Sequence, residues 1–123
     1  MATLNDRVLD NGLTVLDTEA NRVDICSSEP TTYAAATSTL TLGNETSISI
    51  SAPADASPNG RKVTLSAITG ASVTGTGTAT HYAITDTSNS RLLATGALSA
   101  SQAVTSGNTF SLTASDIRIP DPA

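Results

Sequence analysis

The sequence is poor in aromatic residues, and this scarcity limits both the core and the surface. Among 123 residues there are two Tyr and one Phe, and Trp is absent. The core must therefore be built mainly from Val, Ile, Leu and Ala. Exposed rings for stacking on sugars are also scarce, so a carbohydrate-binding β-sandwich is a less favoured interpretation.

Basic residues are few as well. Six Lys and Arg stand against eleven Asp and Glu, which gives a formal net charge of -5. Binding to a phosphate backbone requires clustered Lys and Arg. Arg61 and Lys62 form the only adjacent basic pair in the sequence. We therefore expect no nucleic-acid partner.

Cysteine and long apolar runs are nearly missing. Cys26 is the single cysteine, which excludes an intramolecular disulfide, and no metal-ligand spacing surrounds it. No run approaches the roughly 18 apolar residues of a membrane span. The first residues contain no apolar segment of a signal peptide. We expect synthesis in a cytoplasm, no membrane partner and no cofactor.

The abundant residues are Thr, Ser, Ala and Gly, and Thr favours half-buried strands. The length suits one domain over residues 1–123. We predict a mainly β (α+β) fold: a small antiparallel β-sandwich or jelly-roll-like domain of about six to eight strands over 21–119. A helix over 4–20 precedes it, and 120–123 form a tail.

The helix rests on the spacing of Leu9, Leu13 and Leu16, which recur on one helical face. Thr3 is a candidate cap of its first turn. Asn11-Gly12 is instead typical of a hairpin. We favour the helix, because two strands would split the three leucines between faces.

Strands are predicted by alternation. Val23 and Ile25 should point inward, as should Ile48 and Ile50 after a turn or bulge at Gly43-Asn44. The segment 62–68 places Val63, Leu65 and Ala67 on one face. Helical turns are expected over 31–37 after Pro30, and a loop over 52–60.

The segment 79–98 predicts a hairpin with a loop of about five residues, around which the rest should be organised. Near the end, Phe110 and Leu112 occupy even positions, whereas Ile117 and Ile119 occupy odd ones. One continuous strand cannot bury both sets, so a bulge or break is required at Ser115-Asp116. The predicted core comprises Ile25, Ile48, Ile50, Val63, Leu65, Tyr82, Ile84, Leu93, Phe110, Leu112 and Ile119.

No catalytic constellation is recognisable. His81 is the only histidine and has no neighbouring thiol, so a packed side chain is the more ordinary interpretation. Cys26 ends a predicted strand, where a buried and inert thiol is common. Gly75-Thr76-Gly77 lacks the Lys and the strand-to-helix context of a phosphate loop. We therefore expect no enzymatic activity.

Segments spread over nearly the whole chain resemble small virion structural proteins of tailed bacteriophages. They are LNDRVLDNGLTVLD, VDICSSEPTTYAAAT, NGRKVTLSA, TGTATHYAITD, LLATGALS and VTSGNTFSLTASDIRIPDPA. The resemblance implies a virion location, with 25–33 as strand, turn and short helix, and with 80–83 and 117–120 on strands. These are structural signatures and not active-site motifs.

Within a virion, the preferred role is a capsid decoration or cement protein. The alternative is a neck, tail or fibre-base accessory protein. Expected partners are the major capsid protein or another virion protein, and further copies of the chain, in a homo-oligomer such as a trimer. The hypothetical interface comprises Ala2, Thr3, Leu4, Asn5, Asp6, Arg7, Asp55, Pro58, Asn59, Pro120, Asp121 and Pro122.

Overall fold

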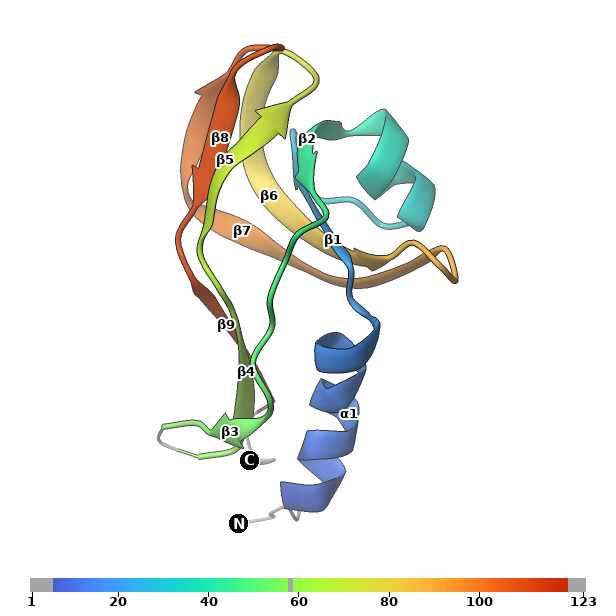
Figure 1. Cartoon of the computed structure of the whole chain (residues 1–123), viewed down its shortest axis with the longest axis vertical. Coiled ribbons are helices and arrows are strands. Elements are labelled where there is room, and N and C mark those ends of the chain that lie inside the picture. Colours follow the sequence, from blue (N-terminus) through green and yellow to red (C-terminus); the bar gives the residue numbers. More distant parts are fainter. Residues whose placement is uncertain (1–5, 58, 120–123) are drawn as a thin grey trace. The chain divides into compact units, whose positions relative to one another are not determined.

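The computed structural model describes residues 6–57 and 59–119 (Figure 1). The described residues are mainly β-strand with a smaller helical part, and the strands pair in antiparallel sheets. The predicted class, a mainly β, β-sandwich-like domain with a helix near the N-terminus, is confirmed. The chain divides into two compact units, and each unit combines segments that are distant in the sequence.

Unit 1 contains the helix and a three-stranded sheet. Helix α1 spans Asp6–Glu19, and the sheet has the order β3-β4-β9. Its strands are β3 (Ala54–Asp55), β4 (Arg61–Leu65) and β9 (Ser115–Ile119). The helix packs on β4. The predicted helix is thus observed, whereas Thr3 lies outside the described residues.

The core of unit 1 is aliphatic. Leu13 and Leu16 of α1 are buried, as are Val63 and Leu65 of β4. Val63 pairs with Ile117 of β9, so these side chains share one face of the sheet. The opposite face carries alternating polar residues. This explains why a helix with only a narrow leucine stripe is stable here: the sheet covers that stripe.

Unit 2 is a six-stranded antiparallel sheet with the order β7-β6-β1-β2-β5-β8. The strands are β1 (Arg22–Cys26), β2 (Thr41–Glu45), β5 (Ile68–Val73), β6 (Gly77–Asp86), β7 (Arg91–Val104) and β8 (Thr109–Leu112). The hairpin predicted over 79–98 is confirmed as β6 and β7, which make the most extensive pairing in the chain. Both strands are longer than expected: β6 continues through the buried residues Thr85 and Asp86, and β7 continues beyond Leu98 to Val104.

A short helical segment covers one face of this sheet beside β1. It begins at Tyr33 and continues as the π-helix η1 (Ala35–Thr39). Ala36 is buried there with Cys26 and Ala83. The predicted helical turns over 31–37 are therefore found, displaced by two residues toward the C-terminus.

The strand predictions were right for β1 and wrong for Ile48 and Ile50. Val23 and Ile25 are buried as predicted, and Asp24 and Cys26 on the other face are buried too. Cys26 packs there with Ala36 of η1. Ile48 and Ile50 do not continue a strand from Leu42. Strand β2 ends at Glu45, and Ile50 makes only an isolated bridge to Leu65.

Six of the eleven residues predicted for the core are buried, and the other five are only partly buried. Those only partly buried are Ile48, Ile50, Tyr82, Leu93 and Ile119, and Ala67 of the predicted β4 face is exposed. The predicted break between Phe110 and Ile119 exists. It falls at Thr113-Ala114, two residues before the expected position, and it separates β8 of unit 2 from β9 of unit 1.

The two compact units do not follow the predicted order of helix, strands and tail. We expected the strands of 21–119 to form one sandwich after the helix. Instead β3, β4 and β9 belong to the same unit as α1, and the remaining strands form the other unit. The cause is the parity change after Leu112, which sends the last strand to a different sheet.

Candidate functional site

The predicted interface residues that the structure describes lie in unit 1. Asp6 and Arg7 begin α1, Asp55 ends β3, and Asn59 lies in the turn between β3 and β4. Ala2, Thr3, Leu4, Asn5, Pro58, Pro120, Asp121 and Pro122 lie outside the described residues. The expected loop over 52–60 is in fact a small hairpin, because β3 pairs with the start of β4.

An ion pair fixes this hairpin. Arg61 Nη1 lies 2.6 Å from Asp55 Oδ1, and Arg61 also donates to the carbonyl oxygen of Pro53 at 3.4 Å. Gly60 has a φ of 82°, and its carbonyl oxygen accepts from the Ala56 N–H at 3.1 Å. The Asp55 side chain is 87% exposed although it is paired. The hairpin therefore presents a positioned carboxylate to solvent.

A second polar cluster lies on the solvent face of β4 and β9. Asp116 accepts from the Thr64 hydroxyl at 2.7 Å and from the Lys62 ammonium at 3.1 Å. These hydrogen bonds, the one from Thr64 above all, lower the pKa of Asp116 below its ordinary value. The cluster holds the two strands in register and keeps a fixed negative charge on the surface.

In unit 2 the one fully buried carboxylate is structural. Asp24 accepts two hydrogen bonds from Arg22, at 2.7 and 2.8 Å, and a third from the Thr41 hydroxyl at 2.6 Å. The hydrogen bond to Asp24 raises the pKa of the Arg22 guanidinium. A buried charge is tolerated when it is paired and its remaining lone pairs are satisfied, as here. Asp24 joins β1 to β2 and has no open position for a ligand.

Cys26 lies beyond this carboxylate on the same face of β1. Its side chain is fully buried, and Sγ lies 3.7 Å from the carbonyl oxygen of Ala36. Burial, and to a lesser extent the charge of Asp24, raises the thiol pKa to about 12. A thiol of this kind is neither a nucleophile nor a metal ligand at neutral pH.

His81 is half-buried and hydrogen-bonded. Its Nδ1 lies 2.9 Å from the Thr80 hydroxyl, which itself donates to the carbonyl oxygen of Ser27 at 2.9 Å. A hydroxyl has one proton, so Nδ1–H must be the donor in the first of these bonds. His81 thus stabilises the irregularity at Thr80, where the register of β6 and β7 shifts.

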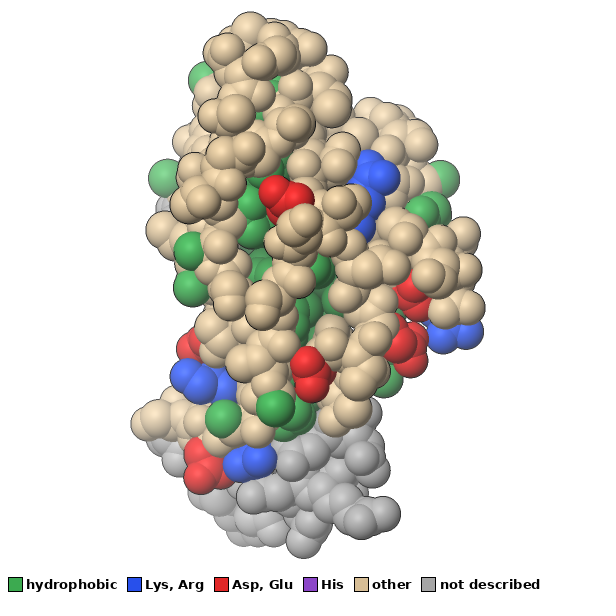
Figure 2. Space-filling model, viewed as in Figure 1, with side chains coloured by type: hydrophobic (Ala, Val, Ile, Leu, Met, Phe, Trp, Pro, Cys, Tyr) green, Lys and Arg blue, Asp and Glu red, His purple; other side chains and the backbone are tan. Residues whose placement is uncertain are grey.

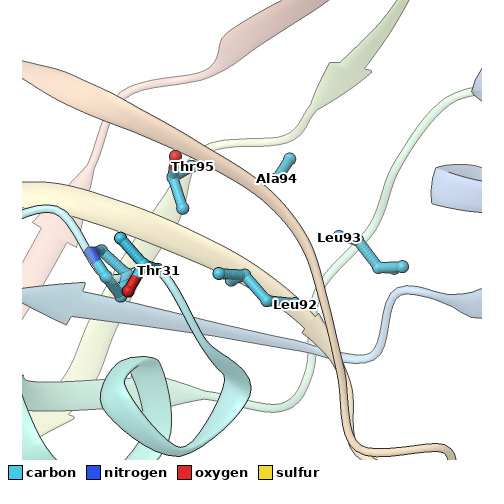
Figure 3. A pocket seen from close by; sticks show the side chains of 6 residues that line it. Thr31, Leu92, Leu93, Ala94 and Thr95 are labelled. Carbon is cyan, nitrogen blue, oxygen red and sulfur yellow. The ribbon is translucent and has the colours of Figure 1, made fainter.

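An open groove borders the edge of β7. It has a volume of about 370 Å³ and is lined by Pro30, Thr31, Leu92, Leu93, Ala94 and Thr95. Figure 3 shows Leu93 and Ala94 on one side of the β7 ribbon, with Leu92 and Thr95 on the other. The lining is largely apolar and contains no ionisable side chain, so it favours contact with a chain over chemistry. The amino-acid composition did not predict this groove.

The described residues contain no group of three or more His, Cys, Asp or Glu side chains that could hold a metal ion. None of the helices in this part of the chain has the length and hydrophobicity of a membrane span. Comparison with family models, with curated proteins and with solved structures found no match to the chain.

Proposed function

We propose that the chain is a structural protein of the virion of tailed bacteriophages, and that it acts as a decoration or cement protein on the capsid. The observation that carries this proposal is the resemblance of segments distributed along the chain, from LNDRVLDNGLTVLD to VTSGNTFSLTASDIRIPDPA. The proposed partners are the major capsid protein or another virion protein, and further copies of the chain.

The character of the surface supports a role in association. On the face shown in Figure 2, charged side chains are scattered, and most of the surface is neither charged nor hydrophobic. Such a surface, rich in hydroxyls and backbone, can be covered by neighbours with little desolvation of charge. Because only the folded subunit binds, each contact stabilises both the subunit and the shell by mass action.

Unit 1 is the proposed attachment unit. It contains every described member of the interface that we predicted from the sequence. Asp55 is exposed but held by Arg61, so its carboxylate is oriented before it meets a partner. Charges at the rim of an interface give orientation and association rate more than affinity. Attachment through the β3–β4 hairpin should therefore weaken as salt is raised.

The test uses particles that lack the protein, to which purified protein is added. Wild-type protein should bind heads and raise their resistance to heat. Asp55→Lys should bind with a slower association rate, whereas Glu29→Lys, the same charge reversal at an exposed residue of unit 2, should bind normally. His81→Ala should also bind and protect normally, because no catalytic step is proposed.

Two outcomes would contradict the proposal at different levels. Equal association rates for Asp55→Lys and wild type would remove the β3–β4 hairpin from the contact. Wild-type protein that ignores heads, and that electron cryomicroscopy locates in the neck, the tail or the fibre base, would replace decoration with the alternative role.

A further inference from the structure

The dipeptide Asn-Gly occurs twice in the sequence, and the structure places the two copies in different surroundings. Asn11-Gly12 lies inside helix α1, whereas Asn59-Gly60 lies in the turn between β3 and β4. An asparagine side chain is attacked most easily by the backbone nitrogen of a following glycine, because glycine has no β-carbon to hinder the approach. The local structure then decides whether each copy can react.

The reaction is an intramolecular displacement, described here for the second copy. The backbone nitrogen of Gly60 loses its proton and forms a bond to Cγ of Asn59. The bond from Cγ to Nδ2 breaks, so that ammonia leaves and a cyclic succinimide remains. Water then opens the ring at either of its carbonyl groups. The products are aspartate at position 59, or isoaspartate, in which the backbone runs through the former side chain and is longer by a methylene group.

Helix α1 holds Asn11-Gly12 in a conformation that does not react. Ring closure requires the backbone to leave the helical dihedral angles. Gly12 is well inside Asp6–Glu19, where its N–H belongs to the hydrogen-bond ladder of the helix. Gly12 also faces β9, since a β-carbon built on it would lie 3.3 Å from Cδ1 of Ile119. Reaction at Asn11 therefore requires a local opening of α1 against the sheet.

The turn at Asn59-Gly60 lies outside both the helix and the strand ladder. The pairing of β3 with β4 ends at Asp55 and Arg61, and Gly60 has a φ of 82°, which glycine adopts without steric cost. Asn59 is partly exposed, so water can reach the ring. The base of the turn is closed by the ion pair of Asp55 with Arg61. A rearrangement at Asn59 can therefore take place within the turn while the strands stay paired.

We propose that Asn59 is a site of spontaneous deamidation in the folded protein, and that α1 protects Asn11 from the same reaction. The product adds a carboxylate to the hairpin that already presents Asp55, and it makes the net charge of -5 more negative by a single charge. Isoaspartate also lengthens the turn, which weakens the hydrogen bond from the Ala56 N–H to the Gly60 carbonyl oxygen.

The test follows both sites in one sample of the purified full chain. The protein is incubated at mildly alkaline pH, either folded or unfolded in guanidinium chloride, and is digested with trypsin at successive times. Cleavage after Arg7, Arg22 and Arg61 releases the peptides 8–22 and 23–61, which carry the two sites separately. Fragmentation in the mass spectrometer assigns the gain in mass to a residue, and chromatography separates the aspartate and isoaspartate forms.

The unfolded chain is the reference, because both copies of Asn-Gly are then free of local structure. At each site the rate in denaturant is divided by the rate in the folded protein. We expect a ratio near unity at Asn59. At Asn11 we expect roughly tenfold or more, since each 1.4 kcal/mol or so needed to open α1 slows the reaction about tenfold. The rate at Asn59 should rise with pH, because the attacking nitrogen must lose its proton.

Asn59→Gln is the matched variant. Its longer side chain closes a ring far more slowly, so conversion at position 59 should be lost while Asn11 behaves as in the wild type. Gly60→Ala is less suitable, because a residue with a β-carbon is strained at a φ of 82°.

Two results would overturn the proposal. One is a ratio at Asn59 of about tenfold or more, which would mean that the folded turn blocks the reaction. The other is an equal ratio at both sites, which would mean that α1 gives no protection. These measurements use purified protein without particles, so the proposed virion role can fail separately.

Discussion

Replacing Gly43 with Ala should destabilise the protein, because a β-carbon has no room at this position. Gly43 lies in β2, opposite Val73 of β5 and beside the buried ring of Phe110. A β-carbon built there lies 2.6 Å from the carbonyl oxygen of Ser72 and 2.9 Å from Phe110 Cε1. The first of these contacts is with backbone, so no change of rotamer can relieve it.

The expected cost follows from the distances. Contacts between non-bonded heavy atoms are most favourable at roughly 3.5 Å or more, so β2 and β5 would have to separate by several tenths of an ångström. Overpacking of this kind costs about 1–3 kcal/mol. The gain from a less flexible unfolded chain offsets about 0.4–1 kcal/mol. Because the clash involves backbone, we expect a net loss of about 2 kcal/mol, which corresponds to roughly 8 °C in Tm.

Urea denaturation followed by circular dichroism measures this loss as a shift in midpoint at unchanged slope. Gly75→Ala is the matched control, because its β-carbon would meet nothing closer than Leu42 Cδ2 at 3.5 Å. The control should be neutral or slightly stabilising. In Gly43→Ala, adding Phe110→Leu should recover only part of the loss, since the contact with Ser72 remains. Equal stability of Gly43→Ala and Gly75→Ala would refute the reasoning.

Three further predictions concern single side chains. Phe110→Ala should cost about 3–5 kcal/mol in the same denaturation assay, because the ring is buried against Gly43; a loss near zero would place the ring outside the core. Cys26, with its thiol pKa of about 12, should react with a thiol reagent at mildly alkaline pH only as the protein unfolds; rapid labelling of native protein would contradict its burial. Thr64→Val should raise the pKa of Asp116 in a carboxyl NMR titration, because it removes the hydrogen bond that lowers this pKa most. Because the folded-state pKa of Asp116 is lowered, its carboxylate stabilises the protein above the unfolded-state pKa, and this stabilisation is lost as pH falls through the folded-state pKa. Thr64→Val should therefore lose less stability than the wild type as the solution is acidified through this range.

Local patterns predicted much of the fold where neighbours in sequence determine structure. The leucine spacing predicted α1, and the two short apolar runs around 85–91 predicted the β6–β7 hairpin. The parity change between Leu112 and Ile117 predicted a break, which the structure places between the two sheets. In each case the deciding information lies within about ten residues.

Long-range partners explain what local patterns could not predict. Asp24 is buried because Thr41, 17 residues away, and Arg22 satisfy its carboxylate; alternation alone placed it on a solvent face. Ile48 and Ile50 have the same parity as Leu42, but the chain leaves the sheet of unit 2 after Glu45. The groove beside β7 depends on Pro30, which no local pattern connects to Leu92. For the candidate site, the sequence predicted Asp55 and Asn59 in one region but missed the β7 edge entirely.

The order in which the strands are synthesised differs from the order in which unit 1 is assembled. Helix α1 is made before all the described strands, yet the sheet that covers its leucines is complete only when β9, the last of these strands, has been translated. Until then Val63 has no partner at Ile117, and α1 can pack only on an incomplete sheet. Pairing over such separations is slow, because loop closure precedes any stabilising contact. In a nascent chain unit 1 must therefore remain incompletely folded until β9 has been translated, and a stop codon before Ser115 would remove an entire strand from the unit that we propose attaches to the shell.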